Sequence, residues 1–280
     1  MIIIDFNGVV VGQMLSQKTF DEDMMRHQVL NTLRMYNHKF KKQYGQMVIA
    51  IDSKSWRRDY FPQYKHKRRE TRDDNAEQYK RMFAFLDVVK EELRAGMPYP
   101  IIQVDKAEAD DIIATLVHRT QQFGQYEDVM IVSADKDFIQ LHEYSNVKQF
   151  SPMSKKMVSD PDPKRYIFEH ILKGDTSDGI PNILSGDSVF VEGVRQTPLS
   201  KKRIDTIWEE GVASLNEEEY RNYTRNNKLI SLDAIPTEIA KAIEDEFDSV
   251  RNNKVGKMTT MNYLISKKCK LLLECIDEFY

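Results

Sequence analysis

The chain has 280 residues, of which 41% are apolar and 30% are charged, and its formal net charge at pH 7 is −3. This length can bury one good hydrophobic core, with room for a smaller second domain. The near balance of charge points to no class of partner, and no apolar run reaches the roughly 18 residues that a membrane span needs, so we expect no membrane association.

The first half of the chain alternates short apolar runs with helical patterns. The apolar runs predict buried strands at 1–5, 46–52, 99–105 and 128–135, with a fifth at 147–150, and helices are expected at 21–44, 76–95 and 108–123. MIIIDFNGVVVG, at the N-terminus, has no basic leader before Asp5, so it reads as a strand and not as a signal peptide. The alternation predicts an α/β fold: a mostly parallel, doubly wound sheet covered by helices on both faces.

The second half is expected to be mainly helical. A passage rich in Ser, Pro and Asp, residues 151–163, is the candidate boundary between an α/β domain at 1–155 and a helical domain at 160–280. The two cysteines, Cys269 and Cys275, lack the spacing of metal or redox sites. We therefore expect reduced thiols and a cytoplasmic protein.

Each of the four main predicted strands ends on an aspartate: Asp5, Asp52, Asp105 and Asp135. For any one of them the plainer interpretation is a helix cap or a turn residue. Ligands of open α/β sheets, however, bind outside the carboxyl ends of the strands, where side chains from distant segments converge. The four together therefore favour a shared site.

Three short motifs, EADD, SADKDF and GDTSDG, add further acids. The full set is Asp5, Asp52, Glu108, Asp110, Asp111, Asp135, Asp137, Asp175 and Asp178. Clustered carboxylates cannot all stay ionised unless a cation offsets them, and oxygen ligands without His or Cys suit Mg²⁺ or Mn²⁺. So many acids indicate two ions, as in many phosphodiester-cleaving enzymes. Taken alone, EADD is more simply a solvated helix start.

Residues 54–72 hold eight Lys or Arg against two acids, with aromatic residues interleaved. The segment leaves the same sheet edge as the carboxylates, and basic and aromatic side chains bind phosphates and unpaired bases. The candidate nucleic-acid contacts here are Arg57, Arg58, Tyr64, Lys67 and Arg69. A solvated basic helix with a buried aromatic face is the plainer alternative.

Five blocks, IIDF, IDSKSWRRDYFPQYKHKRR, KAEADD, SADKDFIQLHEYSNVKQFSPM and LKGDTSDGIPN, resemble in the same order the 5′-nucleases of the flap endonuclease family, most of all its ribonuclease H branch from T-even-type bacteriophages. The resemblance covers residues 2 to about 182. It implies a PIN-like nuclease fold with a helical arch at about 54–75 and a helix–three-turn–helix motif in the C-terminal domain.

The resemblance also implies roles for individual residues. The first of two Mg²⁺ ions, for which Mn²⁺ is the substitute, would be held by Asp5, Asp52, Glu108, Asp110 and Asp135. The second would be held by Asp137, Asp175 and Asp178, with Asp111 in an outer shell. Lys65 and Arg68, on the arch, would be catalytic and contact the scissile phosphate, Tyr64 would stack on a base, and Asp105 would be a turn or cap residue.

GDTSDGIPN resembles the start of the helix–three-turn–helix motif, which in relatives binds a monovalent cation. Here the compact Gly-x-Gly turn is absent and ILSGDSVFVEGVRQTPL intervenes, so the monovalent-cation site stays open. Lys201, Lys202 and Arg203 follow a candidate Ser N-cap and are expected to bind backbone phosphates.

We therefore predict a metal-dependent, structure-specific 5′→3′ exonuclease and flap endonuclease with ribonuclease H activity. By resemblance, it would act on DNA and RNA–DNA duplexes with 5′ ends or flaps, remove lagging-strand primers, and work as a monomer in the host cytoplasm. One alternative is an inactive nucleic-acid-binding module. Another is an aspartate-nucleophile phosphatase, which DFNGVV mimics, although Asn7 stands where that chemistry needs a second acid.

The C-terminal stretch KKCKLLLECIDEFY is predicted to be an amphipathic helix that ends in two aromatic residues. It is either a core helix or, by resemblance, a docking tail for the sliding clamp or the single-strand DNA-binding protein.

Overall fold

The computed structural model describes residues 1–15, 20–74, 76–253 and 255–280. Within them a six-stranded sheet has the order β3-β2-β1-β4-β5-β6, and only its edge strand β6 is antiparallel. The strands are β1 (Ile2–Asp5), β2 (Met47–Ala50), β3 (Ile101–Ile102), β4 (Val129–Val132), β5 (Val147–Ser151) and β6 (Lys156–Val158). The strand order reverses between β1 and β4, and this switch point is where an α/β sheet opens a crevice.

Helices cover both faces of the sheet because β1, β2 and β4 are apolar on both sides. One face packs against α1 (Phe6–Leu15), α2 (Glu22–Tyr44) and α5 (Ala76–Gly96). The other packs against α6 (Ala109–Thr120), the 3-10 helix η1 (Lys136–Glu143) and α10 (Thr237–Val250). In β1, Ile2 and Ile4 face the first layer and Ile3 faces the second, as the two-residue period of a strand requires. The predicted α/β class is confirmed.

Two elements differ from the sequence prediction. The N-terminal stretch is not one strand: it turns into α1 at Phe6, because the Asp5 carboxylate accepts a hydrogen bond from the backbone N–H of Gly8 and so caps the new helix. β6 lies inside the predicted boundary passage. Its three residues are too few to show an alternating pattern, and β5 supplies the pairing that makes them a strand.

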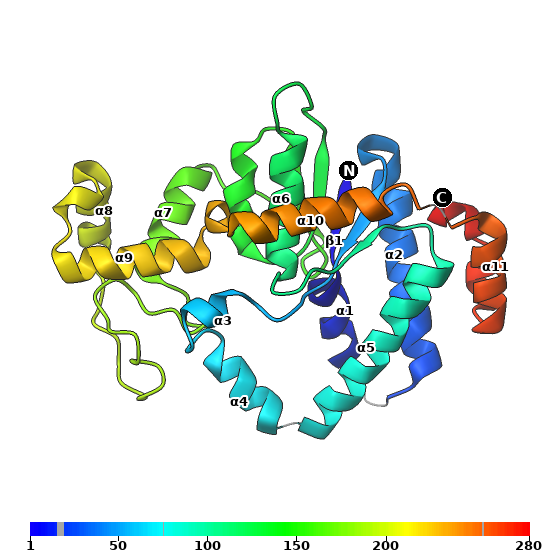
Figure 1. Cartoon of the computed structure of the whole chain (residues 1–280), viewed down its shortest axis with the longest axis horizontal. Coiled ribbons are helices and arrows are strands. Elements are labelled where there is room, and N and C mark those ends of the chain that lie inside the picture. Colours follow the sequence, from blue (N-terminus) through cyan, green and yellow to red (C-terminus); the bar gives the residue numbers. More distant parts are fainter. Residues whose placement is uncertain (16–19, 75, 254) are drawn as a thin grey trace.

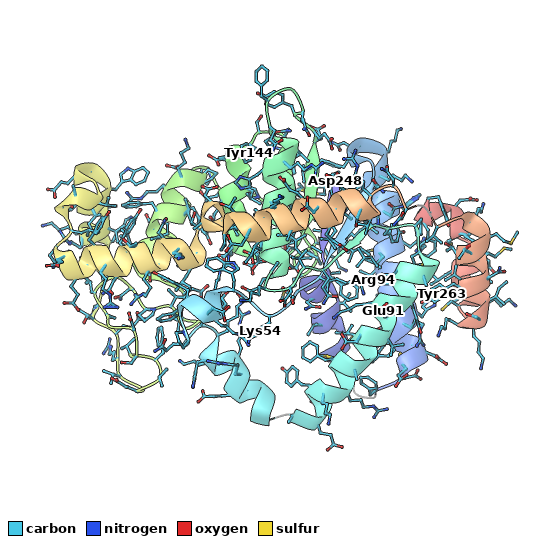
Figure 2. All side chains as sticks on the ribbon, in the orientation of Figure 1. Lys54, Glu91, Arg94, Tyr144, Asp248 and Tyr263 are labelled. Carbon is cyan, nitrogen blue, oxygen red and sulfur yellow. The ribbon has the colours of Figure 1, made fainter. Side chains whose placement is uncertain are left out.

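The basic segment forms an arch. It begins after β2 near Lys54 (Figure 2), continues through α3 (Arg57–Tyr60) and α4 (His66–Asp74), and returns to the body through α5. Figure 1 shows α4 and α5 as two arms of a V on the side of β1 where α1 lies. Lys65, between α3 and α4, has a left-handed backbone with φ of 57°.

The rest of the chain is mainly helical, as predicted, apart from a long connection without helix at 174–200. Its helices are α7 (Pro163–Lys173), α8 (Lys201–Glu210), α9 (Glu217–Ile230), α10, α11 (Lys257–Ser266) and α12 (Lys270–Leu273), with short 3-10 turns η2 (Val212–Ser214), η3 (Leu232–Ala234) and η4 (Ile276–Phe279). In Figure 1, α7, α8 and α9 lie at one end of the molecule, α10 crosses beside α6, and α11 lies at the other end. The division into two domains stays a prediction.

The C-terminal stretch is not the single amphipathic helix that was predicted. α12 has one turn and is followed by η4, whose Phe279 is only 1% exposed and packs in the core beside α2. Tyr263 of α11 points towards α5 (Figure 2), and its hydroxyl donates a hydrogen bond of 3.0 Å to Glu92. The C-terminal helices therefore pack against the α/β layer. In the part of the chain with described coordinates, no helix is both long enough and apolar enough to cross a bilayer.

Candidate active site

A cleft of about 420 Å³ lies at the carboxyl ends of the strands, on the side facing the arch. Its acidic lining is Asp5, Asp52, Asp110, Asp135 and Asp178, which are five of the nine predicted metal-binding carboxylates. Lys65, Lys67 and Arg68 line the arch side. The fold thus brings three of the four strand-end aspartates, Asp5, Asp52 and Asp135, and the basic segment to one cavity. The fourth, Asp105, is exposed in a turn and does not line the cleft.

Asp5 is the last residue of β1, and Asp52 lies just after the neighbouring strand β2. Asp5 is 7% exposed and accepts hydrogen bonds from the Gly8 N–H, at 2.9 Å, and from the Ser133 hydroxyl, at 2.7 Å. Asp52 accepts one of 2.7 Å from the Ala109 N–H, which ties it to the start of α6. Burial and the charge of Asp52 raise the pKa of Asp5 to about 6. A bound cation would remove the repulsion that causes part of this shift.

Asp110 and Asp135 complete the acidic side of the cleft. Burial, and then the charge of Asp135, raise the pKa of Asp110 well above its ordinary value. Burial and the charge of Asp137 raise the pKa of Asp135. Such a concentration of carboxylate oxygens fits a hard divalent cation such as Mg²⁺ or Mn²⁺.

Glu108 is turned towards the arch and does not line the cleft. It is the N-cap of α6, is 6% exposed, and accepts hydrogen bonds from the Ser55 hydroxyl at 2.6 Å and from Lys65 Nζ at 2.5 Å. Burial by itself would raise the pKa of Glu108, but the charges of Lys65 and Arg57 lower it to about 2. The Lys65 ammonium also lies 3.6 Å from Asp178, so it stands as a cation between two carboxylates.

The root of the arch is docked on the turn that carries Asp178. The backbone N–H of Lys65 donates a hydrogen bond of 2.7 Å to the carbonyl of Asp178, and the Arg68 guanidinium lies 2.6 Å from its carboxylate. A Cβ on Gly179, whose φ is +74°, would lie 2.9 Å from the carbonyl oxygen of Gln63. This close approach requires glycine and fixes the catalytic candidates Lys65 and Arg68 relative to the acids.

A second group of ligand-type side chains lies beside the cleft. One ligand atom each from Asp137, His170 and Asp175 lie within 4.8 Å of one another. His170 Nε2 is 3.2 Å from Asp137 and 3.8 Å from Asp175. Burial opposes protonation of His170, but the close approach of Asp137 and the charges of both carboxylates raise the pKa of the imidazole above its ordinary value.

Two predicted nucleic-acid contacts, Arg57 and Tyr64, and the predicted outer-shell acid Asp111 are buried. Arg57 is 3% exposed and forms ion pairs with Asp111, at 2.9 Å, and with Glu108, at 3.2 Å, and it also donates to the carbonyl of Leu229. Asp111 is fully buried behind the cleft. Tyr64 is 2% exposed, and its hydroxyl donates towards Glu108 and Asp178. In this conformation Arg57 has no free face for a phosphate, and Tyr64 has none for a base.

The other predicted nucleic-acid contacts are more accessible. Arg58 and Arg69 are half-buried, and Lys67 is exposed on the arch, with its ammonium 5.2 Å from the centre of the Phe190 ring. Ser200 caps α8 as predicted, and Lys201 and Lys202 are exposed in its first turn. Arg203 is paired with Glu219 at 2.9 Å. Their role in binding nucleic acid stays a prediction.

The sequence reasoning missed several residues of the site. Tyr79 and Phe83 line the cleft from α5, with ring centres 6.2 Å apart and nearly parallel planes. Their four-residue spacing places them on one helix face, but nothing in the sequence says that this face meets the acids. Asn7 lines the cleft and donates a hydrogen bond of 2.6 Å to Asp52. His170 was also missed, because the six histidines are scattered along the sequence and none stands in a pattern typical of metal ligands.

Two backbone carbonyls of the GDTSDGIPN turn, those of Pro181 and Asn182, are paired with protein donors. The Arg225 guanidinium, in a residue only 4% exposed, donates to the carbonyls of Pro181, at 2.9 Å, and Asn182, at 3.4 Å. The Asn226 amide donates to the Pro181 carbonyl at 2.8 Å. These two carbonyl oxygens are therefore already paired with protein donors, and the monovalent-cation site stays an open prediction.

Residues 10–168 match the family described as 5′-3′ exonuclease, N-terminal resolvase-like domain, and residues 162–279 match the family described as T4 RNase H, C terminal. The chain is 33% identical to the Ribonuclease H of Enterobacteria phage T4 over 293 residues, which span 99% of this chain and 95% of that protein. The chain belongs to the 5′–3′ exonuclease family. This 5′–3′ exonuclease is also 30% identical to DNA polymerase I of Rhizobium leguminosarum over 145 residues, 49% of the chain and 13% of the polymerase.

Solved structures of bacteriophage T5 proteins share the fold of this 5′–3′ exonuclease. One, co-crystallised with metal ions, has a TM-score of 0.63 and 17% identity over 88% of this chain and 98% of that chain. Another, a flap endonuclease in a pseudo-enzyme–product complex with DNA and metal ions, has a TM-score of 0.62 and 16% identity, covering 90% and 99%. The predicted family and the predicted phosphodiester hydrolase class, a structure-specific 5′–3′ nuclease, are confirmed.

Proposed function

We propose that the cleft binds two divalent ions, Mg²⁺ or in its place Mn²⁺, and hydrolyses phosphodiesters at the 5′ ends and flaps of DNA and RNA–DNA duplexes. The observation that carries the proposal is the convergence of five carboxylates and three arch cations on one cavity at the switch point of the sheet. Related proteins support the proposal, since one relative is a phage ribonuclease H and a structural neighbour was crystallised in a complex with DNA and metal ions.

The proposed metal ligands divide between two neighbouring places. Asp5, Asp52, Asp110 and Asp135, with Glu108 behind them, would hold the first ion. Asp137, Asp175 and Asp178 would hold the second, and Asp111 supports the first group through Arg57. When bound, the ions supply a water molecule of lowered pKa and offset charge on the departing 3′-oxygen.

The chain's own cations would hold the scissile phosphate. Lys65 and Arg68 lie on the arch side of the cleft, opposite the acids, so their charges can offset negative charge that grows on the phosphoryl oxygens. The Lys65 ammonium has three N–H donors and lines the cleft, so it can contact both Glu108 and a phosphate. Tyr79 and Phe83 supply an apolar wall beside these groups.

The duplex is proposed to bind away from the cleft. Lys201 and Lys202 are exposed where the N–H groups of the first turn of α8 also favour phosphate. The biological task that follows is removal of lagging-strand primers by a monomer in the cytoplasm. The sliding clamp and the single-strand DNA-binding protein stay predicted partners.

The phosphatase alternative lacks support from the geometry. Asn7, which stands two residues after Asp5, donates its amide hydrogen to Asp52 and cannot protonate a leaving group. Loss of activity is the other alternative, and it would leave a nucleic-acid-binding module. The retained acids and arch cations in one cleft argue against it.

Cleavage assays test the proposal. End-labelled flap, nicked and RNA-primed substrates should release 5′-phosphorylated products only when Mg²⁺ or Mn²⁺ is added. Asp135→Asn should abolish most cleavage, and Lys65→Ala should slow the single-turnover rate by about 10²-fold, as removal of one charge-stabilising group does elsewhere. The matched control is Asp105→Asn, an exposed turn residue after β3, which should cleave normally. Near wild-type cleavage by Asp135→Asn would reject the site.

A further inference from the structure

His170 is set between two carboxylates by the local structure around it. It lies on α7, where its ring stacks on that of Tyr166 one turn earlier, with centres 6.0 Å apart and planes 20° apart. The side chain is 20% exposed, and Nε2 faces the acids. The imidazole is therefore oriented by the fold.

The local backbone orients Asp137 and Asp175 so that each presents a carboxylate oxygen to this nitrogen. Asp175 Oδ1 accepts from the N–H groups of Ser177, at 2.7 Å, and Asp178, at 3.2 Å, so its Oδ2 is left to face His170. Asp137 sits in the first turn of η1, and its Oδ1 faces the same nitrogen. One nitrogen and two oxygens thus converge from three separate elements.

The spacing of these atoms suits ligands of one ion. Neighbouring ligands at about 2.1 Å from a metal lie about 3.0 Å apart in an octahedron and about 3.4 Å apart in a tetrahedron. The observed separations from Nε2 are 3.2 Å and 3.8 Å. Among the residues whose placement is described, this is the one trio of His, Cys, Asp or Glu atoms that meets such a metal-site criterion.

We propose that His170 is a nitrogen ligand of the second divalent ion, together with Asp137 and Asp175, and that it biases this site towards Mn²⁺ or Co²⁺ over Mg²⁺. Divalent transition metals accept imidazole nitrogen, with affinities that rise from Mn²⁺ to Co²⁺, whereas Mg²⁺ prefers sites built of oxygen alone. The inference deepens the proposed function and rests on it, since it concerns the second of the two proposed ions. With His170 added to the nine proposed carboxylates, the second site would have a nitrogen ligand and the first would have oxygen ligands alone.

The direct test is to load the full-length protein with Mn²⁺ and detect bound nitrogen by pulsed electron paramagnetic resonance. We expect two Mn²⁺ per chain, one of them coupled to a single ¹⁴N nucleus. His170→Ala should remove that coupling and lower the affinity for the second Mn²⁺ by at least about tenfold. This is the lower end of the loss in metal affinity when a residue that supports a metal ligand is removed. His118→Ala is the control, because that histidine pairs with Asp233 at 3.6 Å, and it should change neither quantity.

A second variant, His170→Asp, replaces the nitrogen by an oxygen. It should abolish the ¹⁴N coupling and narrow the preference for Mn²⁺ over Mg²⁺ at the second site, measured by competition. Two Mn²⁺ ions without nitrogen coupling in the wild type would overturn the inference and leave the proposed function standing. Tighter Mn²⁺ binding by His170→Ala than by the wild type would also overturn the inference. It would mean that a protonated imidazole competes with the metal ion for the two carboxylates. No Mn²⁺ bound at either place would overturn the proposed function as well.

Discussion

Gly8 decides where the Asp5 carboxylate lies. A Cβ at this position would fall 2.2 Å from Asp5 Oδ2, whereas a Cβ on Gly12, one turn later in the same helix, would meet nothing within 4 Å. The first glycine is therefore needed by the site, and the second is free to change.

This contrast gives a matched pair of substitutions. Gly8→Ala should displace the Asp5 carboxylate and reduce cleavage by about 10²-fold, the cost of a misplacement near 1 Å at a reacting centre. Gly12→Ala should keep the activity and stabilise the helix by up to about 1 kcal/mol. Single-turnover cleavage and urea unfolding of the two variants check this. Equal activity of both would contradict the positioning of Asp5 by this turn.

The raised pKa of Asp5 makes the stability of the metal-free protein depend on pH. Its pKa rises from 3.8 to about 6 on folding, so the ionised acid destabilises the folded state as pH rises through this interval, and the effect is absent below both values. Asp5→Asn should therefore raise the unfolding free energy in EDTA by about 1–3 kcal/mol at pH 8, with most of the gain lost at pH 4.

Urea unfolding at the two pH values measures this, and Asp105→Asn, in an exposed turn, should change neither value. A metal-free Asp5→Asn protein that is less stable than wild type at pH 8 would show that the carboxylate is not held in the strained, charged environment described here.

At the scale of elements, the arch and the acidic turn behave as one unit. Three features hold the root of the arch against the turn at Asp178 and Gly179. They are the left-handed backbone of Lys65, the hydrogen bond from its N–H to the Asp178 carbonyl, and the absence of a side chain at Gly179. Non-glycine residues adopt the left-handed conformation rarely and at a cost, and at Lys65 the hydrogen bond from its N–H to the Asp178 carbonyl helps to hold it. The arch root is thus placed before substrate arrives.

The C-terminal element is a core element in this structure. Phe279 is 1% exposed and packs with residues of α2, while Leu271 of the same segment is 67% exposed. Phe279→Ala should lower the unfolding free energy by about 3–5 kcal/mol, the usual cost of removing a buried phenylalanine ring. Leu271→Ala should change it by no more than about 0.5 kcal/mol.

Urea unfolding distinguishes the two. An unchanged stability for Phe279→Ala would mean that the last residues form a free tail, as a docking segment for a clamp requires. The exposed residues of the segment keep the docking hypothesis open for a surface contact.

At the scale of the whole molecule, the sequence predicts what depends on periodicity. The predicted helices at 21–44, 76–95 and 108–123 and the buried strands are present because apolar spacing is a local property. The convergence of Asp5, Asp52 and Asp135 follows from a general rule about sheet edges. These parts of the fold and of the site can therefore be predicted from the sequence alone.

What the sequence could not give are the long-range pairings. Arg57 looks like an exposed basic residue, and only the fold shows its guanidinium between Glu108 and Asp111. Tyr64 resembles a stacking residue until its burial is known. His170 lies in an ordinary helical pattern, and its approach to Asp137 depends on how α7 packs against η1.

The central claim is that carboxylates from remote segments trap divalent ions at the sheet edge beside the arch. Anomalous diffraction from a crystal of the protein loaded with Mn²⁺ tests it most directly. We predict one peak among the carboxylate oxygens of Asp5, Asp110 and Asp135 and a second beside Asp137 and Asp175. A well-ordered crystal with no anomalous peak in the cleft would contradict the account.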